Sequence, residues 1–383
     1  MSGVAGTEGA VPKRASFLEL FFDLVFVFAV TQIAATLHAD HSARGWVEAG
    51  LLLWLVWWAW SQYTWAANAI DVDEPQTRVA MLVVTGVTLL AAVSIPDAFA
   101  ADGGWFAVPY VAVRLLGLGL YWAGLRDQPE HRAALRTYLP VAVLSPLVVL
   151  VGGFVDADMR VWVWLVAVAV DVASVAAAGR GEFRVEPAHF AERHGLIVII
   201  ALGESIIAVG ATAADVEPSV ALVTAAAAAF AIVATLWWAY FSGFQATVEH
   251  ALVREPDHRR RGHLARDVFT LGHLPIVAGT VMFAVGVEEA VLHPDEHLEP
   301  FGRWAVGLGL VLVQLGLAAA AYRSGRVVLV ARVVAVGAVT LLVAVAGGVV
   351  SSLALTVALA VVLVALAGLE AARPRSPVAQ ASS

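Results

Sequence analysis

Long apolar stretches separated by short polar segments make up most of the chain. A membrane-spanning helix needs about 20 consecutive apolar residues, and twelve stretches reach or approach that length. They predict twelve transmembrane helices over residues 16–38, 46–68, 77–97, 104–125, 137–154, 160–178, 190–212, 219–244, 266–289, 303–322, 326–348 and 351–370. The predicted fold class is therefore an all-α polytopic membrane protein.

The fifth stretch and the last two are the least regular parts of this pattern. The fifth is short and contains Pro140 and Pro146. The apolar run after residue 326 is too long for one helix, which would overshoot any bilayer. We divide this run at Gly347-Gly348 and Ser351-Ser352, which gives two helices.

The basic residues test this helix count independently. With the N-terminus inside, eighteen Lys and Arg residues fall in the predicted inner loops and only three in the outer loops, namely Arg44, Arg160 and Arg303. Short cytoplasmic loops carry such an excess, and one missed or added helix would scramble it. We therefore expect a cytoplasmic N-terminal tail over residues 1–15 and a disordered cytoplasmic tail over 371–383.

Composition supports a membrane protein and excludes several other classes. Hydrophobic residues make up 60% of the 383 positions and charged residues 14%, whereas a soluble domain is closer to half apolar and a quarter charged. The net charge of −8 gives no basic stripe, so no nucleic-acid partner is expected. Cysteine is absent, which excludes disulfides and thiolate sites. We expect membrane lipids as partners, and the oligomeric state stays open.

A weak internal similarity relates the two parts of the chain. The first helix begins Phe17-Leu-Glu19 and the seventh Phe190-Ala-Glu192, while Trp57-Trp58 and Trp237-Trp238 follow in the second and eighth helices. Each predicted repeat has six helices, so both would enter the membrane in the same direction. This pattern predicts a parallel six-plus-six repeat with a first half over residues 16–178 and a second over 190–370. Chance similarity between apolar helices is the alternative.

Several motifs together resemble one bacterial family. They are the run Phe17–Gln32 with its Phe-Phe-Asp, the segment Tyr63–Asp71, the run Glu192–Ser205 with Glu-Arg-His-Gly and Gly-Glu-Ser, and the segments His273–Gly279 and Phe283–Ala290. In this order they resemble the low temperature requirement A (LtrA) family over nearly the whole chain. Ala69 departs from the larger or polar residue expected there. The resemblance implies a polytopic inner-membrane protein and no settled biochemical activity.

Ionisable residues inside predicted membrane helices are the main candidates for function, because burying a charge there is costly. We predict a polar core, whose members are Asp23, Arg114, Asp171, Glu204 and His273. Secondary candidates lie on the same helices or beside them, and these are Glu19, Gln32, Glu192, His194 and Ser205. The alternative for each is a structural role in holding helices together.

Spacing and depth give these residues specific expected partners. Glu19 and Asp23 share one helix face, where two anions repel unless a cation, a proton or an arginine compensates them. Arg114 is a cation near the midplane, so we expect it to pair with Asp171 or Glu204. Asp23, Glu204 and His273 are expected to line one polar cavity open to the cytoplasm.

Three classes of function agree with the sequence. The first is a proton- or cation-linked transporter or ion pathway for an unknown small solute or ion. The second is a structural or stress-adaptation protein that responds to the state of the bilayer, and the third is an intramembrane enzyme acting on a hydrophobic substrate. The sequence contains no known catalytic spacing, so catalysis is the weakest of the three, and we predict neither a cofactor nor a metal site.

Overall fold

The computed structural model describes residues 13–126, 128–178, 183, 185–214, 216–325 and 329–372. The first six helices of this part are antiparallel neighbours along the chain, and they are α1 (Phe17–Ala39), α2 (Ala43–Ala67), α3 (Pro75–Val93), α4 (Gly104–Gly124), α5 (Pro129–Gly153) and α6 (Ala157–Ala178). Each coincides with one predicted stretch. The predicted tail over 371–383 lies outside the described residues from residue 373 onward, as do residues 1–12 of the other tail.

The remaining helices include three short π-helical segments. They are α7 (Pro187–Ala214), α8 (Val220–Ala239), η1 (Tyr240–Phe244), α9 (Gln245–Arg254), α10 (His258–Ala265), η2 (Arg266–Leu271), α11 (His273–Leu292), α12 (Pro300–Gly325), α13 (Val330–Leu341), η3 (Leu342–Ala346) and α14 (Ser352–Ala371). Because each π segment continues its neighbouring helices, the described residues form twelve helical stretches, which confirms the predicted number.

Ten of these twelve stretches are long and apolar enough to cross a membrane. Two predicted spans fall short of that standard. The helix α2 carries Arg44 and Glu48 in its first turns and Gln62 nearer its end, and the stretch Val330–Ala346 is shorter than the others. All twelve predicted helices therefore form, and ten of them meet the length and hydropathy expected of a membrane span.

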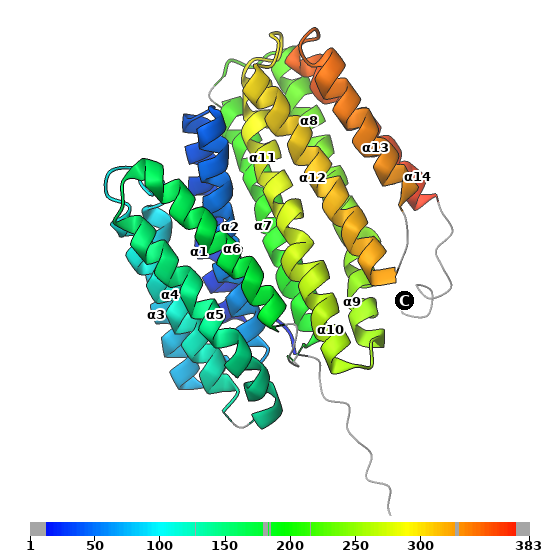
Figure 1. Cartoon of the computed structure of the whole chain (residues 1–383). Helices are drawn as coiled ribbons and strands as arrows, with labels where there is room; N and C mark the ends of the chain where they lie inside the picture. The colour runs from blue at the N-terminus through cyan, green and yellow to red at the C-terminus, as the bar shows by residue number, and fades with distance from the viewer. Residues whose placement is uncertain are drawn as a thin grey trace, which may run out of the picture.

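The helices fall into two side-by-side groups (Figure 1). Helices α1–α6 lie on the left in blue to green, and α7–α14 lie on the right in green to red. Contact between the groups runs mainly through α1 against α7 and α11. A hydrogen bond of 2.8 Å from Trp57 Nε1 to the carbonyl oxygen of Thr270 also ties α2 to η2. This interface between the groups holds most of the buried charge described below.

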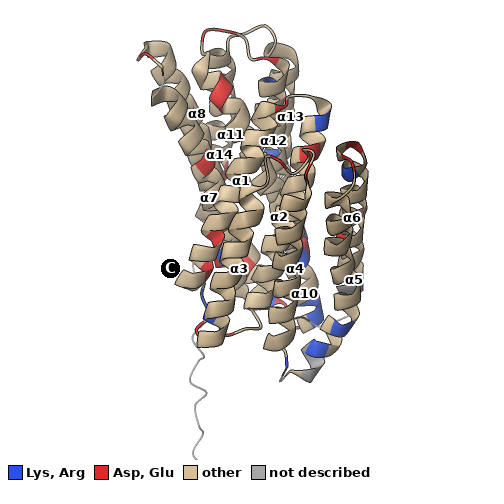
Figure 2. Cartoon of the chain, turned by 90° about the vertical axis from the view of Figure 1, so that its left-hand side faces the viewer, with Lys and Arg blue, Asp and Glu red and all other residues tan. Residues whose placement is uncertain are grey.

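Arginine gathers at one end of the bundle. Figure 2 shows blue residues concentrated where α5 and α10 begin. This end also holds the start of α1 and α7 and the end of α12. At the opposite end Arg44 pairs with Glu48 at 2.6 Å. The basic residues that the sequence places in alternate loops therefore gather at one end of the structure. That this end is cytoplasmic stays a prediction.

Glycines permit close contact between the backbones of α11 and α12. A Cβ atom added at Gly279 would overlap the backbone of Gly309, and one at Gly286 would overlap that of Gly302. Small residues allow backbones in membrane bundles to approach in this way. Gly203 in α7 permits no such contact, because a Cβ there meets no atom within 4 Å.

The proposed repeat is not shown by the structure. Its strongest element was the paired tryptophans, yet Trp57 and Trp58 are 3% and 5% exposed whereas Trp237 and Trp238 are each 47% exposed. The two pairs therefore occupy different environments. The first pair packs in the interior and the second faces outward, where a bilayer would cover it.

Candidate functional site

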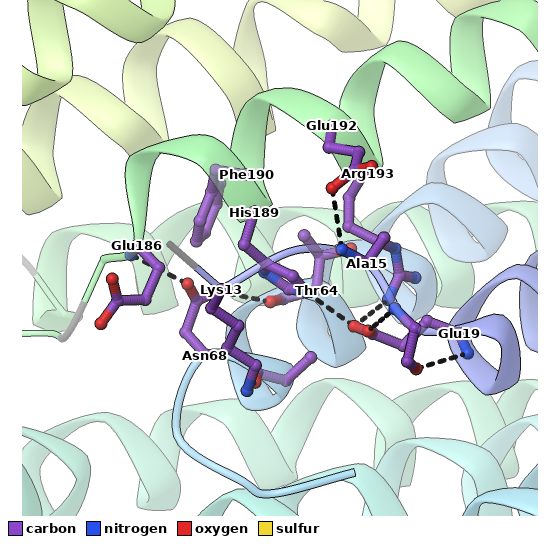
Figure 3. Close-up of polar contacts among 12 residues, drawn as sticks. Lys13, Ala15, Glu19, Thr64, Asn68, Glu186, His189, Phe190, Glu192 and Arg193 are labelled. Atoms are coloured by element: carbon purple, nitrogen blue, oxygen red, sulfur yellow. Dashed lines mark hydrogen bonds and ion pairs between the residues drawn. The ribbon is translucent and has the colours of Figure 1, made fainter. Parts of the chain in front are cut away.

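A cluster of charged side chains lies between α1 and α7, the first helices of the two groups. The guanidinium of Arg193 donates to Glu19 Oε1 at 2.7 Å and to Asp23 Oδ1 at 2.6 Å. The ring nitrogen Nε2 of His189 contacts the same Glu19 oxygen at 2.7 Å, and Trp60 Nε1 donates to Asp23 Oδ1 at 2.8 Å. We call Glu19, Asp23, His189 and Arg193 the α1–α7 cluster; Figure 3 shows three of its members.

Local sequence explains why these groups point toward one another. Ser16 caps α1 and forms a reciprocal capping box with Glu19, which fixes that carboxylate at the first turn. Asp23 lies four residues on, on the same face. On α7, His189 and Arg193 are also four apart, so two anions meet one guanidinium and one imidazole. The compensating cation that the spacing requires is thus Arg193.

The α1–α7 cluster contains more negative charge than its one arginine can balance. All four residues are fully buried, and with a neutral imidazole the cluster carries two negative charges and one positive. Asp23 Oδ2, His189 Nδ1 and Arg193 Nε are buried without a hydrogen-bond partner among the described residues, and Arg193 Nε already carries its proton. An unpartnered buried polar atom costs about 1–3 kcal/mol. Asp23 Oδ2 and His189 Nδ1 are therefore the two places where one proton would restore neutrality.

The segment 13–16, which we call the N-terminal strap, closes the cluster at the arginine-rich end. The amide of Ala15 donates to Glu192 Oε2 at 2.8 Å. The ammonium of Lys13 donates to the carbonyl oxygens of Ala67 and, at 2.7 Å, of Ile70 at the end of α2. A cation is favourable at a helix C-terminus. Glu192, predicted as a secondary site residue, thus anchors the strap (Figure 3).

Two histidines continue the buried polar region away from this cluster. The rings of His194 and His273 lie 5.0 Å apart. His273 Nδ1 donates to Val268 O at 2.8 Å, and its Nε2 lies 2.7 Å from Tyr240 OH. His194 Nδ1 contacts Phe190 O at 2.9 Å. Its buried Nε2 has no partner in the described part of the chain.

A second buried ion pair belongs to the first group of helices alone. Arg114 Nη2 lies 3.2 Å from Asp171 Oδ1, which confirms the expected pairing and selects Asp171 over Glu204. Arg114 also donates to Gln62 Oε1 at 2.7 Å and to Tyr110 OH at 2.8 Å. One positive charge meets one negative charge here, and every guanidinium nitrogen has a partner. This arrangement is typical of a structural pair that joins α2, α4 and α6.

Glu204 lies apart from both ion-pair clusters. Its Oε2 accepts a hydrogen bond of 2.7 Å from Thr31 on α1. Eleven residues separate it from Arg193 on α7, about 16 Å along the helix axis. The next residue, Ser205, is buried and donates to Thr280 O at 3.5 Å, and Gln32 is half-buried beside Thr31.

A cavity lies at the boundary between the two groups of helices. Its interior volume is about 80 Å³, and it opens into a wider recess at its mouth. Its apolar wall consists mainly of Trp58, Trp65, Tyr121, Tyr138 and Phe183, and its polar atoms come from Ser61, Gln62, Thr270, His263 and Arg266. Asp23, Glu204 and His273 are not among its lining residues, so the structure does not bring these three together in this cavity.

Sequence reasoning overlooked two members of the α1–α7 cluster. Arg193 was counted among the basic residues of the inner end, although it falls within the seventh helix predicted over 190–212. The structure begins α7 at Pro187 and buries Arg193 completely. His189, which precedes the predicted helix, was not among the candidates. The signal that could have found Arg193 was the uncompensated pair Glu19 and Asp23. Among the described residues no group of three or more His, Asp or Glu side chains could hold a metal ion.

Comparison with known proteins agrees with these features. The family model described as "Bacterial low temperature requirement A protein (LtrA)" matches residues 14–368. An uncharacterized protein of Rhizobium meliloti (strain 1021), RA0937, is 31% identical over 300 residues, which cover 75% of this chain and 72% of the relative. No solved structure matches the chain.

Proposed function

The chain belongs to the bacterial low temperature requirement A family of polytopic membrane proteins, and we propose that this member is a proton-linked transporter of the bacterial cytoplasmic membrane. In this proposal the arginine-rich end and both termini are cytoplasmic, as the excess of basic residues at that end favours. The two groups of helices act as the two moving bodies. The proposed parallel repeat, over residues 16–178 and 190–370, would relate these two groups of helices by a rotation about the membrane normal.

The observation that carries the proposal is the charge imbalance of the α1–α7 cluster. Two buried carboxylates face one guanidinium, and Asp23 Oδ2 and His189 Nδ1 each lack a partner among the described residues. A buried charge that is left uncompensated costs several kcal/mol. Gaining one proton removes that imbalance, so the energy of the cluster depends on its protonation state.

The position of the cluster supports coupling to a conformational change. Asp23 and Glu19 belong to one group of helices and Arg193 to the other, so separating α1 from α7 would break both ion pairs. Protonation of Asp23 weakens its bond to Arg193 and lowers the cost of that separation. Transporters built from two helical bodies move them about a site of this kind near their interface.

Glu204 offers a second proton site on the same two helices. It accepts from Thr31 about 16 Å from Arg193 along α7. Between these positions the α1–α7 contact is apolar, with Phe26, Val30, Ile197 and Ala201 buried. A proton therefore cannot step directly between the two sites in this conformation. This gap is the expected property of a transporter, because it prevents a continuous leak.

Proton flux into proteoliposomes tests the proposal. Vesicles that contain the full chain and a trapped pH-sensitive dye are given a potassium diffusion potential, inside negative, and the internal acidification is followed. We expect wild type to acidify faster than empty vesicles, and both Asp23→Asn and Glu204→Gln to lose at least nine-tenths of this rate. The matched control is Asp158→Asn, whose side chain is 88% exposed and whose flux stays that of wild type.

Two results would contradict the proposal. One is wild-type flux no greater than that of empty vesicles. The other is full flux in both Asp23→Asn and Glu204→Gln, provided that the variants are folded by size-exclusion chromatography. Full flux in variants that are folded but less stable would instead indicate a structural role for the cluster.

A further inference from the structure

The cavity between the two groups of helices is lined by none of the residues of the proton sites described above. It lies between α2, α4, α5 and α6 on one side and α10 and η2 on the other. We propose that it binds a small organic anion with a flat apolar body, such as an aromatic carboxylate. The binding itself is independent of the proposed transport, and only the statement that this anion is the transported solute rests on it.

The walls of the cavity favour a flat apolar body. Five aromatic rings line it, from Trp58, Trp65, Tyr121, Tyr138 and Phe183. Aromatic side chains prefer stacked or edge-to-face contact with other rings. Three of these residues sit on different helices of the first group. A planar ligand could therefore contact rings on several sides at once.

Hydroxyl and amide groups mark the deep side of the cavity. Thr270 Oγ1 is contacted by Trp65 Nε1 at 2.9 Å and by Ser61 Oγ at 3.3 Å, which joins α2 to the π-helical segment η2. Gln62 also lines the cavity and binds Arg114 on its other side. A ligand here would touch both groups of helices, and π-helical segments are frequent at functional sites.

The mouth of the cavity selects for negative charge. Arg266 lines it, and its Nε and Nη2 donate to Asp267 Oδ1 at 2.8 and 2.6 Å, while Asp267 Oδ2 also accepts from Arg323 at 2.8 Å. Two guanidinium groups therefore share one carboxylate, so these three residues together carry one net positive charge. The remaining nitrogen of Arg266, Nη1, can donate a charge-assisted hydrogen bond to a ligand carboxylate. A cationic ligand would be repelled, although the aromatic rings alone would suit one.

Calorimetric titration of the purified full chain in detergent tests this site. The probes are 2-naphthoate, the neutral 2-naphthamide and the cationic 2-naphthylmethylammonium, which share one ring system. We expect naphthoate to bind at least tenfold more tightly than the amide, and the cation not to bind. Arg266→Gln should weaken naphthoate binding at least fivefold and leave amide binding unchanged.

Two further variants separate loss of the site from loss of the fold. Gly262 lines the cavity, and a Cβ there would meet only Phe183 O at 3.9 Å, so Gly262→Phe should fill the cavity and abolish binding of every probe. Arg260→Gln removes an exposed charge from the helix α10 without touching the cavity and should bind naphthoate within twofold of wild type.

The inference is overturned if wild type binds naphthoate no better than the amide, or if Gly262→Phe binds it as wild type does. Equal loss of naphthoate binding in Arg260→Gln and Arg266→Gln would also overturn it, because the effect would then reflect general charge. Naphthoate binding without proton flux in vesicles would contradict the proposed transport function but would still support the binding site.

Discussion

Replacement of Arg193 by methionine is the most informative single perturbation of the α1–α7 cluster. The apolar part of the side chain is kept, but Glu19 and Asp23 lose the cation that both contact. Removal of one partner of a buried pair costs about 3–5 kcal/mol, because the other charge is left buried and unpaired. Here two carboxylates are left, so we expect a value at the upper end of that range.

This free energy can be converted to a shift in melting temperature. The unfolding entropy of about 2.1 cal/mol/K per residue gives roughly 0.8 kcal/mol/K for a chain of this length. A loss of about 3–5 kcal/mol therefore lowers the melting temperature by about 4–6 °C. Thermal unfolding of the detergent-purified protein, followed by tryptophan fluorescence, measures the shift.

A second substitution makes the reasoning refutable. In Arg193→Met with Asp23→Asn, one of the two stranded charges is gone, so at least half of the lost melting temperature should return. Arg323→Met is the control, because its pair with Asp267 is exposed and is worth at most ~1 kcal/mol. If Arg193→Met melts like wild type, or if Asp23→Asn adds its own loss instead of a recovery, the cluster is not held by charge balance.

Two further predictions concern packing and the strap. Gly279→Ala should lower the melting temperature, because its Cβ would overlap the backbone of Gly309, whereas Gly203→Ala should not, since a Cβ there meets open space; equal melting of the two variants would contradict the close α11–α12 contact. Lys13→Met should release the strap from the end of α2 and speed its cleavage by an added protease at least threefold, as read by N-terminal sequencing, and unchanged cleavage would show that the ammonium does not hold it.

Hydropathy and arginine positions predicted the helices well because membrane insertion acts on each stretch almost separately. A run of apolar residues crosses the bilayer whatever it later contacts, so all twelve helices were found. Contacts between helices far apart in the chain are different. The pairing of Arg114 with Asp171 was predicted because few partners exist at that depth. Arg193 was missed because it lies near the predicted start of the seventh helix, where a long basic side chain can reach the polar interface, and only the packing of α7 against α1 buries it.

The cavity could not be predicted from the sequence, since its walls come from helices whose relative rotation only packing decides. Trp58 and Trp65, both on α2, line this cavity, and no sequence pattern distinguishes them from the other tryptophans of that helix. The π-helical segments, such as η2 at Arg266–Leu271, also carry no sequence signal of their own.

The wide turn of η2 separates two surfaces that an ordinary helix would merge. Arg266 and His273 are seven residues apart, which in a continuous α-helix places them about 20° from each other around the axis. The additional residue of a π turn rotates the next part of the helix by roughly 100°. Arg266 therefore faces the cavity while His273 turns toward Tyr240 and His194. One inserted residue therefore lets a single helix contribute side chains both to the cavity and to the separate contact between His194 and His273.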